Sequence, residues 1–253
     1  MKKLLFLTFL SLVSLSLLSQ DYKMSDYYSS IGNYDLSVLW TAKTIMKYEE
    51  IEPIMYRPEP LGYIGDEYQR FYIHFISVIR NSTDPYEYFI YGKTKVQDNI
   101  CDFQGTIRIK KASLIENPYY EKNLKSGKVE GEYQFFENAR QNGTGFFKGK
   151  FASDFVIDAK GVVHYDAMDL YSDSYRNNQF EGTWESYATK EAEKCNWGDW
   201  RIPDSGDLDT GTAEFNASEV YYSNGWENFR HIHKDTPEGK AARIDEDWKW
   251  WLQ

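Results

Sequence analysis

The chain has 253 residues, with 29 basic and 39 acidic side chains and a formal net charge of −10 at pH 7. An acidic surface repels polyanions, which argues against nucleic acid and anionic lipid as partners. Aromatic residues make up 17% of the chain, a composition that favours β-strands over helices. The length is enough for one sizeable hydrophobic core or two small ones.

The first 19 residues have the pattern of a secretion signal. Lys2 and Lys3 precede a run from Leu4 to Leu18 that contains only Leu, Phe, Val, Ser and Thr. This run is shorter than the ~20 apolar residues of a transmembrane helix. We therefore expect a signal peptide over residues 1–19, cleavage after Ser19 and export to the periplasm or the medium. An uncleaved anchor is the alternative. The mature chain would carry a net charge of −12 and no further apolar run of membrane length.

Residues 20–65 are expected to form an N-terminal segment of loops with one short helix. Asp35 is a candidate N-cap. Four apolar residues that follow it fall roughly on one helical face: Leu36, Leu39, Trp40 and Met46. Three prolines between residues 53 and 60 then break any regular element.

Residues 66–235 carry the period of two that predicts β-strands. The clearest run is residues 101–109, where Cys, Phe, Gly and Ile alternate with polar residues. Similar runs follow, and short turns such as Asn142-Gly143 separate them. The predicted fold class is mainly β: an antiparallel meander, closed or nearly closed into a β-barrel, with a short N-terminal helix and a C-terminal helix.

Glycine recurs on the apolar face of four predicted strands, at Gly105, Gly131, Gly149 and Gly182. Glycine weakens a strand interior, so its repetition predicts sharply coiled strands whose exposed backbone is covered by aromatic rings. The fragment from Gly131 to Phe151 resembles a MORN repeat, in which glycines and aromatic residues recur along successive hairpins. The predicted architecture is similar in shape to that of lipocalins and avidin, without their signature residues. More broadly, the chain resembles exported β-proteins of bacteria, a likeness that implies no particular activity.

Residues 236–253 are expected to form a C-terminal helical tail. A helix over Pro237–Leu252 would place four apolar residues on one face: Ile244, Trp248, Trp251 and Leu252. Such a helix would dock on the sheet as a lid or plug.

Cys101 and Cys195 are the two cysteines of the chain. In an exported protein we expect a disulfide between them, which would close a loop of nearly 100 residues and contribute ~4–5 kcal/mol. Two separately buried thiols are the alternative. Neither cysteine has another Cys or His at the spacing of a zinc site, so no metal cofactor is expected.

The sequence contains no recognised catalytic motif, and the candidate ligand-binding residues are aromatic side chains. The sequence has no nucleophile elbow, phosphate-binding glycine loop or His-Glu-x-x-His motif, so no catalytic residue and no cofactor is assigned. Rings at the mouth of a barrel can stack on a sugar or pack on an apolar ligand. The candidates are Tyr72, His74, Trp184, Trp197 and Trp200.

Asp204, Asp207 and Asp209 lie in a stretch rich in Gly and Trp and are a weak candidate calcium site. Their spacing misses the EF-hand pattern. The preferred interpretation is an ordered loop whose aspartates accept backbone hydrogen bonds without a metal.

Three functions remain open from the sequence. The first is an exported, non-catalytic barrel that binds a small apolar or carbohydrate ligand. The second is an interaction module whose curved sheet contacts an envelope protein, and the third is a hydrolase or isomerase with its site in the barrel. A cavity lined by Tyr and Trp would favour the first, and an exposed aromatic patch on a filled barrel the second. Carboxylates and a histidine clustered around one pocket would favour the third.

Overall fold

The computed structural model describes residues 23–46, 53–116 and 124–253. One antiparallel sheet contains ten strands, β1 (Lys23–Asp26), β4 (Leu61–Ile64), β5 (Gln69–Arg80), β6 (Glu87–Val96), β7 (Asn99–Glu116), β8 (Lys125–Glu137), β9 (Gly145–Ile157), β10 (Val163–Tyr165), β11 (Asn177–Ser186) and β12 (Ala192–Asp199). A separate pair is formed by β2 (Thr44–Met46) and β3 (Pro53–Tyr56). The helices are α1 (Tyr28–Ile31), α2 (Val38–Thr41), α3 (Pro237–Glu246) and the 3-10 turns η1 (Glu219–Asn224), η2 (Glu227–Arg230) and η3 (Trp250–Leu252).

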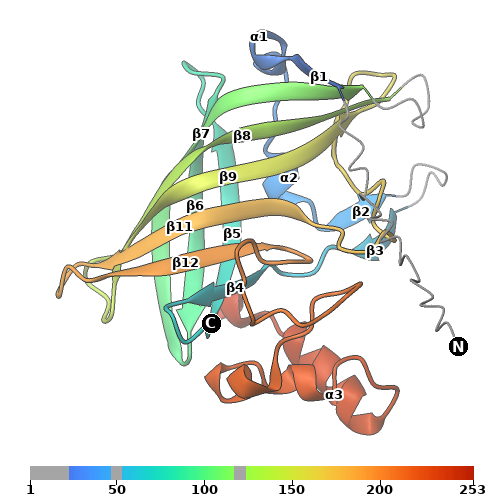
Figure 1. Ribbon diagram of the computed structural model, residues 1–253. Helices are drawn as coiled ribbons and strands as arrows, with labels where there is room; N and C mark the ends of the chain where they lie inside the picture. The colour runs from blue at the N-terminus through green and yellow to red at the C-terminus, as the bar shows by residue number, and fades with distance from the viewer. Residues whose placement is uncertain (1–22, 47–52, 117–123) are drawn as a thin grey trace, which may run out of the picture.

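Eight of these strands close into a ring, in the order β4, β5, β6, β7, β8, β9, β11 and β12 (Figure 1). Closure comes from the pairing of β12 with β4, which aligns Cys195 with Ile64 and Trp197 with Gly62. The predicted fold class, an antiparallel meander closed into a barrel, is confirmed. The ring is uneven, because β7 has 18 residues and β4 has four. The strands also extend beyond residues 66–235 at the N-terminal side, where β1 and β4 lie.

Aromatic rings fill the middle of the barrel. Trp197 of β12 is the centre of this cluster, with its ring 4.9 Å from Phe180, 5.1 Å from Tyr133 and 5.7 Å from Phe71. These side chains project inward from strands on different sides of the ring and belong to one buried cluster. The barrel is therefore packed at its waist by side chains of alternate positions, as the period of two predicts.

Gly149 and Gly182 face the interior and make room for a ring. They are opposite each other on β9 and β11, and the Tyr133 ring lies over both. A Cβ atom at Gly182 would lie 2.2 Å from the carbonyl oxygen of Lys148 and 2.5 Å from Tyr133 Oη. No side chain fits there without a shift of the backbone.

The N-terminal segment closes one end of the barrel. Trp40 of α2 donates from Nε1 to Ser153 Oγ at 3.1 Å, and its ring packs against Tyr88 and Phe151. Leu36 donates its backbone N–H to Tyr88 Oη at 3.0 Å. The predicted helix is wrong in extent, since α2 ends at Thr41, where the next residue has an extended ψ of 124°. Leu36, Leu39 and Trp40, three of the apolar residues on the predicted helical face, are buried.

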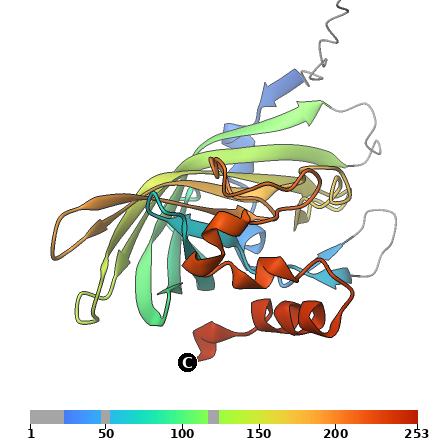
Figure 2. The ribbon, with the colours of Figure 1, turned by 60° about the horizontal axis from the view of Figure 1, so that its bottom comes forward.

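The C-terminal segment packs outside the barrel as a separate layer, which Figure 2 shows in front of the strands. Its own buried cluster centres on Trp226, Phe215 and Phe229, and it reaches the barrel at Tyr63 of β4. Arg70 of β5 is buried beneath it, stacked on the Trp226 ring at 4.2 Å and paired with Glu246 at 3.0 Å. Such a partner offsets part of the cost of burying the charge.

The predicted apolar face of the C-terminal helix is wrong. Ile244 is 64% exposed and Leu252 is 76% exposed, whereas Trp250 is 3% exposed. The reason is that the helix ends at Glu246, so the tryptophans that follow are placed by η3 rather than by continued helical spacing.

The predicted disulfide is also wrong: Cys101 and Cys195 are free, buried thiols. Cys101 lies on β7 and Cys195 on β12, which are four strands apart in either direction around the ring. A disulfide needs Cα atoms about 4.4–6.8 Å apart, close to the spacing of adjacent strands. Residues on opposite walls of an eight-stranded barrel cannot meet this condition.

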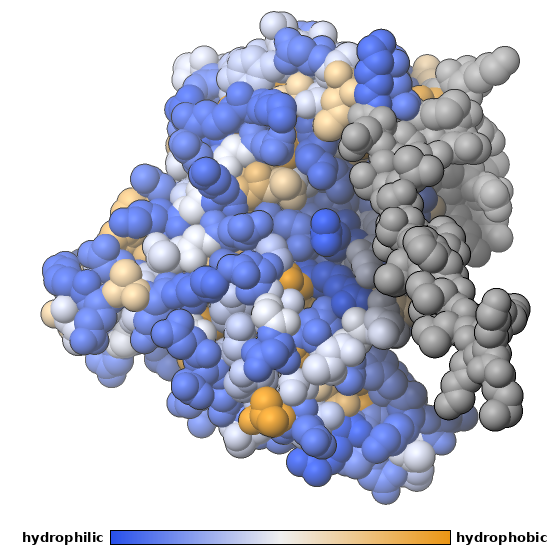
Figure 3. Space-filling model, viewed as in Figure 1, coloured by the Kyte–Doolittle hydropathy of each residue, from blue (hydrophilic) through white to orange (hydrophobic). Residues whose placement is uncertain are grey.

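The face of the molecule in Figure 3 is largely hydrophilic, with hydrophobic residues in small separate groups. Among the described residues, no helix has both the length and the apolar character needed to cross a membrane.

Candidate ligand-binding site

A cleft opens in the side of the barrel because β4 is short. β4 pairs with β5 at two positions only, Tyr63 with Arg70 and Ile64 with Gln69. Beyond them, residues 73–76 of β5 border a cleft of about 740 Å³. We call it the lateral cleft. Its volume lies within the usual range of small-molecule sites.

The floor of the lateral cleft is the aromatic core of the barrel. It is formed by Trp40, Phe75, Phe180 and Trp197. Phe180 and Trp197 are each 1% exposed, so the floor is closed and a ligand would stay outside the barrel interior. The rim carries charged and polar groups from the loop before β4, from β5 and from the C-terminal tail.

His74 and Trp251 form one wall of the lateral cleft. The His74 ring, from β5, stacks on the Trp251 indole with centroids 3.9 Å apart and planes 8° from parallel. His74 Nδ1 lies 2.8 Å from Glu59 Oε2, and both side chains are partly exposed. The C-terminal tail therefore contributes directly to this wall, and the carboxylate fixes the orientation of the imidazole.

Arg57 also lines the lateral cleft and is held by a buried polar cluster. Its guanidinium donates to both carboxylate oxygens of Asp199, at 3.0 and 3.1 Å. Tyr165 Oη and Asn178 Nδ2 also donate to Asp199, at 2.9 and 2.8 Å. Burial raises the pKa of the Asp199 carboxyl, and these donors oppose the rise. Such a bidentate pair fixes the orientation of the Arg57 guanidinium plane.

Asn178 has an unusual environment beside this cluster. Its φ of 47° is left-handed, and its Nδ2 also donates to the carbonyl of Leu39 at 2.8 Å. Its Oδ1 is buried and has no hydrogen-bond partner among the described residues. Asn178 borders the lateral cleft, but this oxygen is buried and is not exposed to it.

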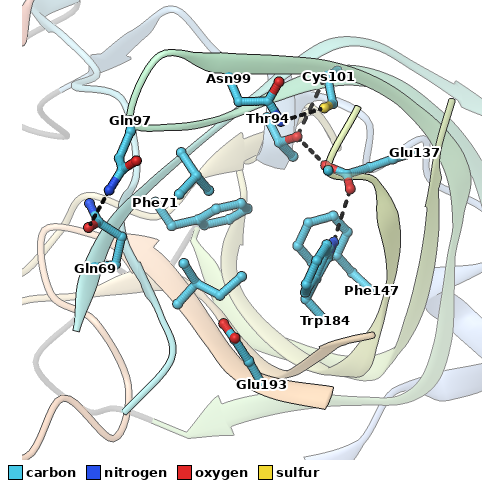
Figure 4. Close-up of a pocket in the computed structure, with 13 residues that line it drawn as sticks. Gln69, Phe71, Thr94, Gln97, Asn99, Cys101, Glu137, Phe147, Trp184 and Glu193 are labelled. Carbon is cyan, nitrogen blue, oxygen red and sulfur yellow. Dashed lines mark hydrogen bonds between the residues drawn. The ribbon is translucent and has the colours of Figure 1, made fainter. Parts of the chain in front are cut away.

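A second cavity of about 300 Å³ lies at the end of the barrel opposite α2. We call it the mouth cavity, and Figure 4 shows the view into it. Phe71, Phe147 and Trp184 form its apolar walls, and Glu137 projects into it from the end of β8. The barrel interior is thus filled at its waist, closed by the chain at one end and hollow at the other.

The predicted ligand-binding residues do not form one site. His74 and Trp197 line the lateral cleft, and Trp184 lines the mouth cavity. The alternation of residues 180–184 indicates which side chains of β11 point inward, and Trp184 is one of them.

Tyr72 and Trp200 line neither cavity. The Tyr72 ring lies 6.1 Å from that of Trp250 and stacks on the Arg70 guanidinium at 4.7 Å, beneath the C-terminal tail. The Trp200 ring packs 5.9 Å from Tyr175. Both rings pack against other side chains in the positions that they occupy.

Asp204, Asp207 and Asp209 turn to different partners. Asp204 pairs with Lys194 at 2.7 Å, and Asp207 accepts from Tyr221 Oη at 3.0 Å. Asp209 pairs with Arg201 at 2.6 Å, while its Oδ1 accepts from the backbone N–H of Gly211 and Asn216. Within the described part of the chain, no group of three or more His, Cys, Asp or Glu side chains is arranged to hold a metal ion.

Sequence reasoning missed Arg57, Glu59 and Glu137. The alternation of β8 could have indicated Glu137. It lies two residues after Phe135, at the next inward position of the strand, where an apolar residue is expected. Arg57 and Glu59 had no such signal, since they lie among prolines in a segment without periodicity.

Comparison of the chain with protein-family models, with curated proteins and with solved structures found no match.

Proposed function

We propose that this protein is exported and binds a small carbohydrate in the lateral cleft. The observation that carries the proposal is the combination, in one cleft of about 740 Å³, of an aromatic floor and polar groups that other residues hold in place. Export rests on the N-terminal sequence pattern alone.

The chemistry of the lining fits a sugar better than a purely apolar molecule. A sugar ring has an apolar face that packs on aromatic side chains and a perimeter of hydroxyl groups that need hydrogen-bond partners. Arg57 supplies a donor group and Glu59 an acceptor group, and Asp199 and His74 hold these two side chains in place. An apolar ligand would instead remove water from these polar groups without replacing it, which costs free energy.

Tryptophan fluorescence titration tests the proposal, with malto-, cello-, xylo- and chito-oligosaccharides as probes. We expect a saturable response to one of these series. Trp251→Ala should weaken that binding about tenfold, because it removes a stacking surface and the support of His74. Trp248→Ala is the matched control, since Trp248 belongs to the same tail and is outside the lining of the cleft. Saturable binding of laurate with no response to any sugar would contradict the carbohydrate assignment.

Acid–base catalysis on the same ligand is a second candidate function. It is favoured by the His74–Glu59 pair, in which a carboxylate orients an imidazole at the wall of the cleft. If the site is catalytic, incubation with the oligosaccharide that binds yields a chemically altered product, and His74→Gln abolishes this conversion while binding persists. Unchanged sugar after prolonged incubation would leave binding as the function.

A further inference from the structure

The mouth cavity contains a buried carboxylate that has no cationic partner among the residues that the structure describes. Glu137 is 7% exposed and lies at the wall of the cavity. Its oxygens accept from Thr94 Oγ1 at 2.5 Å, Trp184 Nε1 at 2.9 Å and the backbone N–H of Gly145 at 2.8 Å. All three donors are neutral. Buried charges in proteins are normally paired with an opposite charge, so this environment is incomplete for a carboxylate.

The rest of the cavity adds negative charge and no positive charge. Glu193 of β12 also lines the cavity and points toward its centre in Figure 4. No lysine, arginine or histidine is among the described residues that line it. The remaining polar groups at the rim are the amides of Gln69, Gln97 and Asn99. An anion would be repelled here, whereas a cation would meet two carboxylates.

Aromatic side chains border the same space, with Trp184 partly exposed and Phe71 and Phe147 buried. Phe71 from β5, Phe147 from β9 and Trp184 from β11 reach the cavity from three strands. The faces of such rings carry partial negative charge and attract ammonium groups, most strongly when water is excluded. A cavity of about 300 Å³ is at the small end of ligand sites, which limits the occupant to one small molecule.

We propose that the mouth cavity binds a small organic ammonium ion, with the ammonium group near Glu137 and Glu193 and the apolar part of the ligand against Phe71, Phe147 and Trp184. Burial raises the pKa of Glu137, which is consistent with a carboxyl group that lacks its counter-charge. The site is separate from the lateral cleft, and the proposal does not depend on carbohydrate binding there.

Isothermal titration calorimetry with two matched probes tests this proposal. Tyramine carries an ammonium group, and 4-(2-hydroxyethyl)phenol replaces that group by a hydroxyl at nearly the same size. We expect tyramine to bind saturably and the neutral phenol to bind at least about tenfold more weakly, since contacts to charged groups are worth more than neutral ones. Equal affinities, or no binding of tyramine to folded protein at millimolar concentration, would overturn the proposal.

Three variants locate the site. Glu137→Gln keeps an acceptor for Trp184 and should weaken tyramine binding by about tenfold or more. Glu193→Gln changes an exposed residue, preserves folding and should weaken binding severalfold, so the test stands even if Glu137→Gln is unstable. Glu132→Gln is the control: Glu132 is on the same strand as Glu137 but is exposed on the outer face and pairs with Lys110. If Glu132→Gln weakens tyramine as much as Glu193→Gln does, overall charge explains the binding and the assignment to the mouth cavity is wrong.

Discussion

The two ends of the barrel are built from the same kind of strand but end differently. At one end, Leu36, Leu39 and Trp40 enter the interior and complete the aromatic core. At the other end, a cavity of about 300 Å³ remains beside Phe71, Phe147 and Trp184. Inward aromatic residues therefore do not decide whether a barrel is full or hollow. The decision depends on whether another part of the chain supplies side chains to fill the space.

Each end also contains a buried carboxyl group. Asp166, near the closed end, accepts from Ser126 Oγ at 3.1 Å and from the Met168 N–H at 2.9 Å. Glu137, at the open end, faces the mouth cavity. Burial raises the pKa of both. Asp166 lines neither the lateral cleft nor the mouth cavity, which makes the two groups a useful contrast.

The largest expected effect comes from making the closed end hollow. Trp40→Ala removes the side chain that joins α2 to Tyr88, Phe151 and Ser153. We expect the free energy of unfolding to fall by about 3–5 kcal/mol, the usual cost of truncating a buried aromatic residue. Urea unfolding measures this. Leu252→Ala is the control, because it is exposed and should change stability by less than about 0.5 kcal/mol. A loss below about 1 kcal/mol for Trp40→Ala would show that α2 is not part of the core.

Asp166→Asn should stabilise the closed end. Burial raises the pKa of Asp166 to about 6, above the value of about 3.9 for an unfolded chain. The folded state therefore binds the proton more tightly, and this group makes the wild-type protein less stable as the pH rises from about 4 to about 6. An amide can keep both hydrogen bonds without charge. We expect the variant to be about 2–3 kcal/mol more stable than wild type at pH 7, with the difference vanishing near pH 4.

Urea unfolding of both proteins at several pH values checks this prediction. Asp173→Asn, at an exposed position in the neighbouring loop, serves as the control and should give a pH-independent difference near zero. A stability gain for Asp166→Asn that is equally large at pH 4 and pH 7 would show that the carboxyl group does not titrate in this range.

Gly182→Val tests the waist of the barrel between the two ends. The added side chain would collide with the Lys148 carbonyl and with Tyr133 Oη. We expect a loss of about 1–3 kcal/mol, typical of overpacking, measured by the shift of the urea midpoint. Thr183→Val, one residue along the same strand and on the other face, should be nearly neutral. An unchanged midpoint for Gly182→Val would mean that the interior at this level is not tightly packed.

The smallest expected effect concerns Asp204, Asp207 and Asp209, which lie outside the barrel. Because these carboxylates pair with Lys194, Tyr221 and Arg201, we expect no coupling of the fold to calcium. The melting temperature in EDTA should equal that in millimolar CaCl₂. A bound cation would raise it by mass action. A rise of several degrees that Asp207→Asn abolishes would restore the calcium interpretation.

Sequence reasoning located strands better than contacts between them. The alternation through Phe103, Tyr133 and Phe180 was read correctly, because side chains on successive strand positions point to opposite faces whatever the partner strand is. The pairing of Cys101 with Cys195 was wrong, because it depends on which strands are neighbours in the closed ring. The same limit applies to the helical tail: spacing suggested that Ile244 is buried, whereas the end of α3 turned Trp250 inward instead.

The lateral cleft and the mouth cavity were decided by the tertiary structure alone. His74 and Glu59 are brought together across a proline-rich loop, and Trp251 reaches them from the far end of the chain. The sequence by itself determined the β class, the inward aromatic residues and the glycines that admit them, because these follow from local periodicity and from the size of single side chains. Cavities arise where segments distant in the sequence leave space between them, and no local sequence pattern indicates where that happens.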